Sequence, residues 1–331
     1  MPVFPYGEAA LVGALKTCPE DFVVTEELGF EPAGQGQHRW LFVEKRNLTT
    51  QELVERVAGH IGVRPRDVGF SGLKDKHAIT RRWFSVPLAE APAEFPINEG
   101  YRVLKQAWHT RKLRRGTHSG NFFEVRLQAV TQFPELARVQ LEQIRTQGFA
   151  NYFGEQRFGH RQANVAQALR SLSNSRLPRW RKSLYLSALR SHLFNHILAK
   201  RIQLGLWQEP LDGDIFMLRG SRSVFSAPVD DAIRQRHAEL DISSTASLYG
   251  SGPSGLTGQA DEIEREVFHA NAEIVQCLDQ QNVKRQMRAM RAVVSDLVVE
   301  YASEQQTLEL SLRLPAGCYV TSLLDHVLQP E

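Results

Sequence analysis

The chain has 331 residues, of which 42% are hydrophobic and 23% are charged, and its formal net charge is +3. At about 150 residues per domain, this length predicts roughly two domains with ordinary globular composition. No apolar run approaches the roughly 20 residues that cross a bilayer, so the sequence excludes a membrane-spanning helix. The N-terminus has no basic segment before its apolar residues, so we expect no signal peptide.

The chain has three cysteines, Cys18, Cys277 and Cys318, which lie far apart in the sequence. Their number is odd and their spacing matches no zinc motif, so neither a disulfide framework nor a zinc site is expected. We interpret them as free thiols of a cytoplasmic protein.

The first 150 residues alternate between strand and helix signals. Thr49 and Glu52 have the spacing of a capping box, and a helical stripe of apolar residues follows them. Gly148 ends a second helical segment that begins near Pro134. The expected strands are 21–27, 40–44, 68–71, 83–86 and 123–127, and a polar turn is expected at 72–77.

The later residues differ in character. The pattern predicts helices over 164–172 and 187–206, a loop over 247–258 and a mostly helical segment over 259–291. Residues 307–314 alternate as a strand. The sequence therefore predicts an α+β fold in which a helix-rich middle is inserted into a first domain, whose sheet the C-terminal strand rejoins.

Positive charge is concentrated in two stretches that contain no Asp or Glu, residues 100–123 and 156–208. A long stretch of one sign attracts a polyanion. Aromatic residues such as Trp108, Phe158 and Trp180 lie among these charges, and this combination suits RNA, whose unpaired bases stack while its phosphates are neutralised. The alternative is a solvated basic face combined with core aromatics.

The most distinctive segment is 69–80, in which Asp75 lies between Lys74 and Lys76 and close to His77. Nearby cations favour an ionised carboxylate, which can act as a nucleophile or as a general base. The alternative is an ordinary exposed turn, because charged surface turns far outnumber sites.

The segment Gly72–Thr80, GLKDKHAIT, resembles the signature of the TruD family of pseudouridine synthases. Four further segments resemble that family in the same order: 18–24, 151–159, 187–195 and 314–319. The resemblance covers nearly the whole chain. It implies a catalytic domain with a mainly antiparallel sheet, formed by residues 1–147 and 294–331, and an inserted helix-rich TRUD domain formed by residues 148–293.

The resemblance implies an enzyme that isomerises uridine 13 of tRNA to pseudouridine without a cofactor. The base leaves through N1 and rejoins the sugar through C5. Asp75 matches the catalytic residue, and either covalent attack or removal of the C2′ proton is compatible with the sequence. The resemblance implies no protein partner, and tRNA is the expected partner.

The same resemblance implies a set of substrate-binding residues. Lys16 is the expected cation beside Asp75, although the residue alone suggests an exposed lysine before a strand. Asn121 and Phe123 match positions that hold the base and stack on it, while core packing is the usual fate of a Phe. Phe122 and Phe123 should face opposite sides of a strand. Glu20 and Gln156 are further pocket residues, or else structural caps and bridges.

Basic residues are expected to contact the RNA backbone. Arg157 is the leading contact in its segment, although a packed interdomain joint accounts for most of that segment. Arg190 and Asn195 either touch RNA or are plain surface residues. The full predicted set is Lys74, Lys76, Arg111, Lys112, Arg114, Arg115, Arg157 and Arg190.

Metal chemistry has weak support in the sequence. Asp212 and Asp214 lie in a turn without a third ligand, and His192 and His196 have no accompanying carboxylate. We therefore predict no metal site. Two rival functions stay open: a non-catalytic RNA-binding or RNA-chaperone protein, and a metal-dependent enzyme that cleaves phosphodiesters with Asp75 and one of the turn aspartates.

Overall fold

The computed structural model describes residues 2–72, 75–87, 100–159, 163–172 and 176–329. Its helices are α1 (Thr50–Ile61), α2 (Glu135–Gln147), α3 (Ala163–Ser171), α4 (Arg179–Gln203), α5 (Asp231–Ala238), α6 (Gly258–Ala270), α7 (Ala272–Asp279) and α8 (Val320–Leu324). In the described parts of the chain, no helix has both the length and the apolar character that crossing a bilayer requires.

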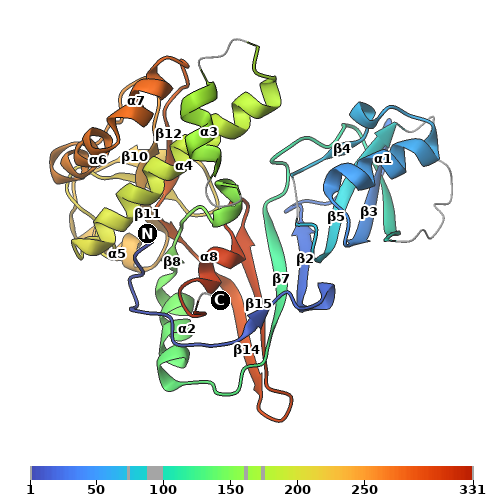
Figure 1. Ribbon diagram of the computed structural model, residues 1–331, viewed down its shortest axis with the longest axis horizontal. Coiled ribbons are helices and arrows are strands. Elements are labelled where there is room, and N and C mark those ends of the chain that lie inside the picture. Colours follow the sequence, from blue (N-terminus) through green and yellow to red (C-terminus); the bar gives the residue numbers. More distant parts are fainter. Residues whose placement is uncertain (1, 73–74, 88–99, 160–162, 173–175, 330–331) are drawn as a thin grey trace. The chain divides into compact units, whose positions relative to one another are not determined.

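Among the described residues, strands and helices are interspersed along the sequence (Figure 1). They are β1 (Ala14–Leu15), β2 (Phe22–Glu27), β3 (His38–Arg46), β4 (Gly69–Phe70), β5 (Ile79–Pro87), β6 (Tyr101–His109), β7 (Gly120–Gln128), β8 (Phe149–Ala150), β9 (Ile215–Leu218), β10 (Val224–Ser226), β11 (Ile242–Leu248), β12 (Gln286–Ala289), β13 (Arg291–Ala292), β14 (Ser295–Ala302) and β15 (Thr307–Pro315). The predicted α+β class is confirmed.

The chain forms two compact units. Unit 1 comprises Met1–Ala9, Arg138–Val293 and Cys318–Val327, and unit 2 comprises Ala10–Ala137, Val294–Gly317 and Leu328–Glu331. These bounds differ from the sequence-based division, which grouped both chain ends with the first domain. Hydrogen bonds explain the difference: Tyr6 Oη donates to Gly148 O at 2.6 Å, and Ala150 N donates to His326 Nε2 at 3.1 Å.

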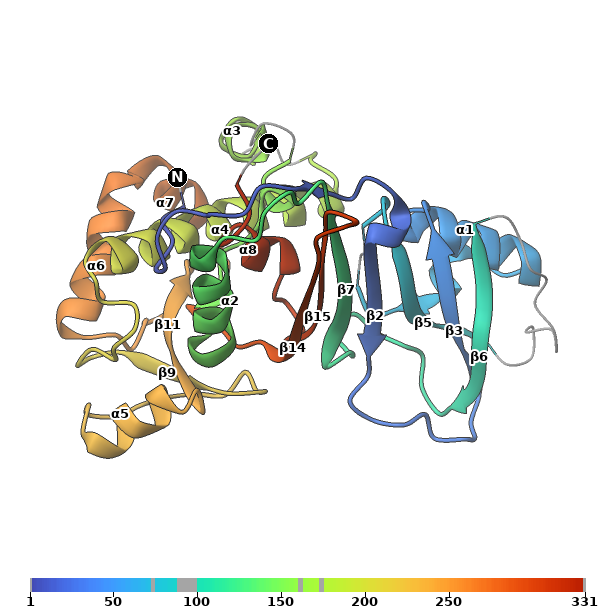
Figure 2. The same ribbon diagram turned by 90° about the horizontal axis from the view of Figure 1, so that it is seen from below.

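Unit 2 is built on one sheet with the strand order β14-β15-β7-β2-β5-β3-β6, to which β1 and β4 add short pairings. All neighbours are antiparallel except β2 and β5. Figure 2 shows these strands side by side, with α1 on one side of β3 and β5. The C-terminal strand β15 pairs with β7, as the sequence predicted.

Helix α1 covers part of one sheet face because its apolar stripe matches the strand alternation. Leu53 and Val57 of the helix pack with Leu41, Val43 and Phe84 of the sheet, and all five are buried. The predicted capping box is confirmed: Glu52 N donates to Thr49 Oγ1 at 3.1 Å, and Thr49 N donates to Glu52 Oε2 at 2.6 Å. The side chains on this covered face of the sheet carry the site described below.

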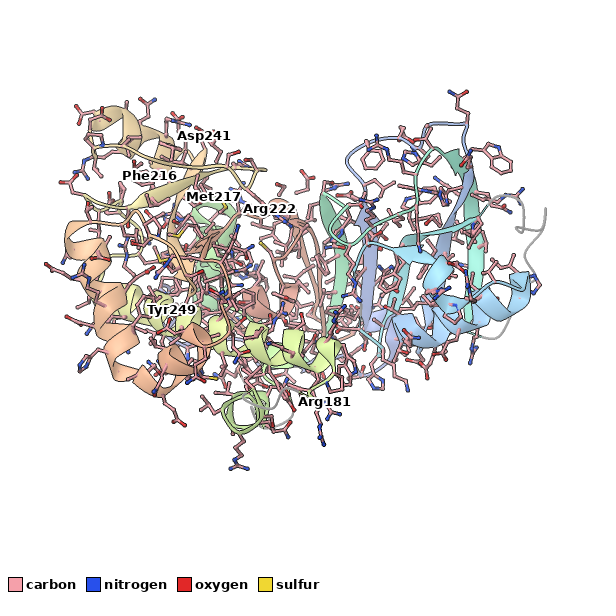
Figure 3. All side chains as sticks on the ribbon, turned by 90° about the horizontal axis from the view of Figure 1, so that it is seen from above. Arg181, Phe216, Met217, Arg222, Asp241 and Tyr249 are labelled. Carbon is pink, nitrogen blue, oxygen red and sulfur yellow. The ribbon has the colours of Figure 1, made fainter. Side chains whose placement is uncertain are left out.

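Unit 1 packs helices against a four-stranded sheet of order β10-β9-β11-β12. Helix α4 lies against α3, α6 and β11, and Phe216 of β9 is buried with Ile233 and Ile242 (Figure 3). The sequence analysis did not predict this sheet. It also extended the last helical segment too far: α7 ends at Asp279, Asn282 has a φ of +54°, and residues 286–289 instead pair with β11.

Candidate active site

Asp75 lies in unit 2 immediately before β5. Its Oδ2 accepts a hydrogen bond from Lys16 Nζ at 3.0 Å, and the side chains are 19% exposed for Lys16 and 29% for Asp75. The carboxylate and the ammonium group are therefore paired but open to solvent on one side. The predicted meeting of these two residues, 59 positions apart in the chain, is present.

The main chain of Lys16 has an unusual conformation, with a φ of +61°. A residue with a Cβ adopts this left-handed region at a cost of roughly 1–2 kcal/mol, and such strain is typical of functional sites. The ammonium group lies 4.1 Å from the centroid of the Phe22 ring. The ring and the Asp75 carboxylate thus hold one cation between them.

Asp21 supports the loop that carries Lys16, and sequence reasoning did not identify it. It is fully buried and accepts hydrogen bonds from Thr17 Oγ1, from Cys18 N at 3.1 Å and from Gln128 Nε2 at 2.8 Å. Burial alone would raise the pKa of Asp21, but these hydrogen bonds outweigh burial and lower it. Asp21 therefore stays an anion that fixes the turn after Lys16.

The aromatic predicted to stack on the base packs against Phe22, the ring that contacts Lys16. Phe123 on β7 is buried and meets Phe22 edge to face, with ring centroids 6.3 Å apart. Phe122 instead contacts the Arg313 guanidinium at 4.9 Å from the ring centroid, so the two neighbours face opposite sides as predicted. Asn121 lies two residues before Phe123 on the same face and is also buried.

The main chain at Asp75 and at Gly72, three residues before it, is held by two buried cations that sequence reasoning missed. Lys45 Nζ donates to the carbonyl oxygens of Asp75 at 2.7 Å and Leu48 at 2.6 Å. Arg82 Nη2 donates to Gly72 O at 2.7 Å. Both side chains are fully buried. The signal was present in the alternation, which places Lys45 on the apolar face of its strand.

A basic loop between β6 and β7 packs against the strand that precedes Asp75. Gly116 N donates to Ser71 O at 2.7 Å, and Lys112 Nζ donates to Arg66 O at 2.6 Å. The guanidinium groups of Arg111, Arg114 and Arg115 are exposed, and none of the three forms an ion pair within the described parts of the chain. Four predicted RNA-binding residues therefore lie on the loop that borders the Asp75 segment.

The other predicted residues of unit 2 have separate positions. Glu20 is on the surface, in an ion pair with Arg46, and hydrogen bonding to its own backbone together with Arg46 lowers its pKa. Lys76 is exposed. Lys74 lies outside the described residues.

In unit 1, three of the segments that carry the family resemblance meet at Arg157. Its Nη1 donates to Ser187 Oγ at 2.9 Å and its Nη2 donates to Tyr319 Oη at 2.6 Å. Asn195 binds both the N–H and the carbonyl of Phe153 at 2.9 Å. These contacts all lie within unit 1, so they show that the segment is packed there and do not test whether it forms an interdomain joint. Gln156 is exposed on the same short turn.

Arg190 also makes structural contacts. Its Nη2 donates to Leu248 O at 2.9 Å and to Lys284 O at 3.0 Å, and burial lowers its pKa. The guanidinium thus ties α4 to the end of β11 and to the segment before β12, a structural role that was not anticipated from the sequence.

The two turn aspartates of the metal hypothesis are used otherwise. Asp214 is buried and forms a bidentate salt bridge with Arg201, with distances of 3.0 and 2.9 Å. Asp212 accepts a hydrogen bond from Val229 N at 3.2 Å. In the described residues, no group of three or more His, Cys, Asp and Glu side chains is arranged to hold a metal ion.

The model of the family described as tRNA pseudouridine synthase D (TruD) matches residues 1–172 and 160–327. The chain belongs to the TruD family. This membership agrees with the resemblance of the five sequence segments.

Individual relatives match over nearly their full length. The chain is 39% identical to tRNA pseudouridine synthase D of Methylococcus capsulatus over 331 residues, which are 98% of this chain and 93% of that protein. It is 40% identical to tRNA pseudouridine synthase D of Pseudomonas entomophila, over 95% of this chain and 91% of that protein.

The fold is also similar to a solved structure. The crystal structure of the putative tRNA pseudouridine synthase D from Methanosarcina mazei superposes with a TM-score of 0.74 at 20% identity. The alignment covers 99% of this chain and 96% of that one. At this identity the likeness shows the TruD fold alone.

Proposed function

We propose that this protein is a tRNA pseudouridine synthase that isomerises uridine 13, with Asp75 as its catalytic carboxylate. Membership of the TruD family supports the reaction class. The observation that carries the residue assignment is the partly exposed Lys16–Asp75 pair, whose ammonium group contacts the Phe22 ring, which in turn packs against Phe123. The reaction cleaves the N1–C1′ bond and forms the C5–C1′ bond, so it needs no redox cofactor.

The roles of the neighbouring residues follow from their chemistry. A carboxylate enclosed by a base would lose stabilisation from water, and the Lys16 ammonium group offsets that loss. Extraction of the uridine costs a few kcal/mol, which stacking in the pocket offsets. Phe123 is the proposed stacking residue, and stacking contributes about 1–3 kcal/mol per base. Asn121 is the proposed hydrogen-bonding partner of the base.

The tRNA backbone is proposed to contact the basic loop beside Asp75. Arg111, Arg114 and Arg115 are exposed there, so they can neutralise phosphates without first breaking an ion pair. Lys74, Lys76, Arg157, Arg190, Glu20 and Gln156 belong to the same proposal with weaker support. A tRNA substrate and three free cysteines also suit the cytoplasm.

The deciding experiment is incubation of purified protein with unmodified tRNA transcript and no additives, followed by mapping of pseudouridine. We expect pseudouridine at position 13. Modification at another position would overturn the assignment of uridine 13 as the target. No modification at all would favour an RNA-binding protein. Chelator-sensitive strand cleavage would favour the metal-dependent rival.

Salt dependence tests the electrostatic part of the proposal. If the basic loop neutralises phosphates, the logarithm of the tRNA affinity falls linearly with the logarithm of salt concentration. Replacing Arg111 and Arg114 together with Gln should reduce that slope by about 1–2. A slope that the double substitution leaves unchanged would remove this loop from the interface.

A further inference from the structure

The buried lysine of β3 has no direct access to a substrate. Lys45 is fully buried, and burying an ammonium group is costly unless hydrogen bonds compensate it. Its Nζ donates to Leu48 O at 2.6 Å and to Asp75 O at 2.7 Å. The chain thus buries a cation in order to bind two main-chain carbonyls, one of which belongs to Asp75.

Arg82, on the neighbouring strand β5, binds the main chain in a similar way. Its guanidinium is fully buried and donates to Gly72 O at 2.7 Å and to Thr50 Oγ1 at 3.2 Å. Burial lowers the pKa of Arg82, and Glu26, whose carboxylate lies 3.6 Å away, partly offsets that effect. Gly72 and Asp75 are therefore each tied by a buried cation to the sheet beneath α1.

Strand register explains why the two cations can act on one segment. Lys45 pairs with Thr80 and Val43 pairs with Arg82 between β3 and β5. Lys45 and Arg82 are therefore diagonal neighbours on one face of the sheet, close enough for their side chains to bind the same nearby segment of chain. One of them binds the chain before Asp75, and the other binds Asp75 itself.

We propose that Lys45 is a positioning residue that fixes the main chain of Asp75 for catalysis, while Arg82 fixes the same segment at Gly72. This inference rests on the proposed function of Asp75. Lys16 would then orient the carboxylate, and Lys45 the backbone from which it extends. Precise placement matters because a displacement of about 1 Å at a reacting group can cost about 100-fold in rate.

The test is the substitution K45M, with T80V as a matched control. Met has a similar apolar stem but donates no hydrogen bond. Thr80 lies opposite Lys45 in the register and is equally buried, and its hydroxyl has no hydrogen-bond partner among the described residues. We expect K45M to lower kcat about 100-fold and to leave KM for tRNA within about threefold, whereas T80V changes neither.

The variant K45R provides a graded comparison and a substitute if K45M does not fold. Its guanidinium retains donors near the two carbonyls but in a different geometry. We expect a loss of kcat of about tenfold with KM unchanged. A folded K45M or K45R whose kcat stays within threefold of the wild type would overturn the inference, as would a loss confined to KM.

Hydrogen exchange adds a readout that does not depend on activity. Amides of residues 75–78 should exchange faster in K45M than in T80V, because Lys45 no longer holds the Asp75 carbonyl. Equal exchange in the two variants would overturn the positioning role. The proposed function is tested separately, since it fails if the wild type forms no pseudouridine or if Asp75→Asn remains active.

Discussion

Two aspartate–cation pairs, one in each unit, differ in the number of hydrogen bonds that the carboxylate accepts and in its exposure to solvent. In unit 1, Asp214 accepts two hydrogen bonds from Arg201, one from Ser244 Oγ at 2.8 Å and one from Leu211 N at 2.9 Å, and it is buried. In unit 2, Asp75 receives Lys16 on one oxygen and is 29% exposed. A saturated carboxylate stabilises the fold, whereas one with an open side can react.

The largest expected effect is on activity at the open pair. Asp75→Asn keeps the shape of the side chain but removes its charge, so we expect pseudouridine formation to fall by roughly 10⁴-fold or more. Affinity for tRNA should stay within a few-fold. The free energy of unfolding should change by at most about 1 kcal/mol, because the pair with Lys16 is partly exposed. Single-turnover rates and urea unfolding measure the two quantities.

A loss of stability as large as the loss of activity would contradict this contrast. It would mean that Asp75 is structural in the same sense as Asp214.

The saturated pair should show the opposite behaviour. Asp214→Asn leaves the buried Arg201 guanidinium without a compensating charge, and such a change typically costs about 3–5 kcal/mol. Asp212→Asn is the matched control, because Asp212 is two residues away and accepts one hydrogen bond at the surface. We expect the control to change the free energy of unfolding by less than about 1 kcal/mol, as measured by urea denaturation.

If both turn substitutions abolished a metal-dependent activity and left stability unchanged, Asp214 would have the ligand role that its salt bridge argues against.

The sequence predicted the secondary structure best where local signals are complete. Thr49 and Glu52 cap α1 as expected, and Gly148 ends α2 with a φ of +76°. The sequence did not predict the sheet of unit 1, because β9 and β10 are only four and three residues long. Short strands become stable through their partners in the sheet, and sequence patterns do not show those partners.

The same distinction applies to the site. Asp75, Lys16 and Phe123 were proposed by resemblance; the structure pairs Lys16 with Asp75, and Phe22 links Lys16 to Phe123. Lys45 was missed because a lysine on a strand is usually read as exposed. Its role depends on two carbonyl oxygens, of Leu48 and Asp75, whose positions depend on the fold. The alternation of β3 can show that Lys45 is on the buried face, but residue identity does not show which backbone carbonyls it binds.

Glu264 is intermediate between the two aspartates, because it is buried but only one of its oxygens accepts a hydrogen bond from the described part of the chain. We therefore expect it to make stability depend on pH. Its Oε1 accepts from Ser247 N at 2.6 Å, while its Oε2 has no hydrogen-bond partner among the described residues but lies 3.8 Å from Arg285 Nη1 in an ion pair. Burial raises the pKa of Glu264 from 4.5 to about 7. The protonated acid is therefore favoured in the folded state, so its stabilisation is complete below pH 4.5 and is lost as the pH rises through 7.

The variant Glu264→Gln does not titrate. Its free energy of unfolding, relative to the wild type, should increase between pH 5 and pH 7 by at most about 1.4 kcal/mol per pH unit. Buried His237 and His326, whose pKa values burial lowers to about 3 and about 4, lose stability toward low pH in both proteins and cancel in the difference. Urea unfolding at several pH values measures the difference in free energy of unfolding between the variant and the wild type. A difference that does not change with pH would contradict the prediction.

The smallest expected effect comes from removing one donor from the saturated carboxylate. Ser244 Oγ donates to Asp214 Oδ2 at 2.8 Å, and Ser244→Ala leaves the other three hydrogen bonds in place. A hydrogen bond to a charged group contributes about 1.5–3 kcal/mol. We expect the lower end of that range, because the Arg201 bridge still neutralises the carboxylate.

If the four hydrogen bonds to Asp214 stabilise the fold as one unit, the changes in free energy of unfolding caused by Ser244→Ala and by Asp214→Asn should not add. Once the carboxylate is neutral, the serine hydroxyl no longer binds a charge. A double-mutant cycle measured by urea unfolding should therefore give a coupling energy of about 0.5–3 kcal/mol. Simple additivity would show that the serine acts independently of Asp214, and the four hydrogen bonds would then not form one unit. An equivalent cycle at Asp75 would not separate structure from activity, because Lys16, the cation that binds its carboxylate among the described residues, is also proposed to support the reaction.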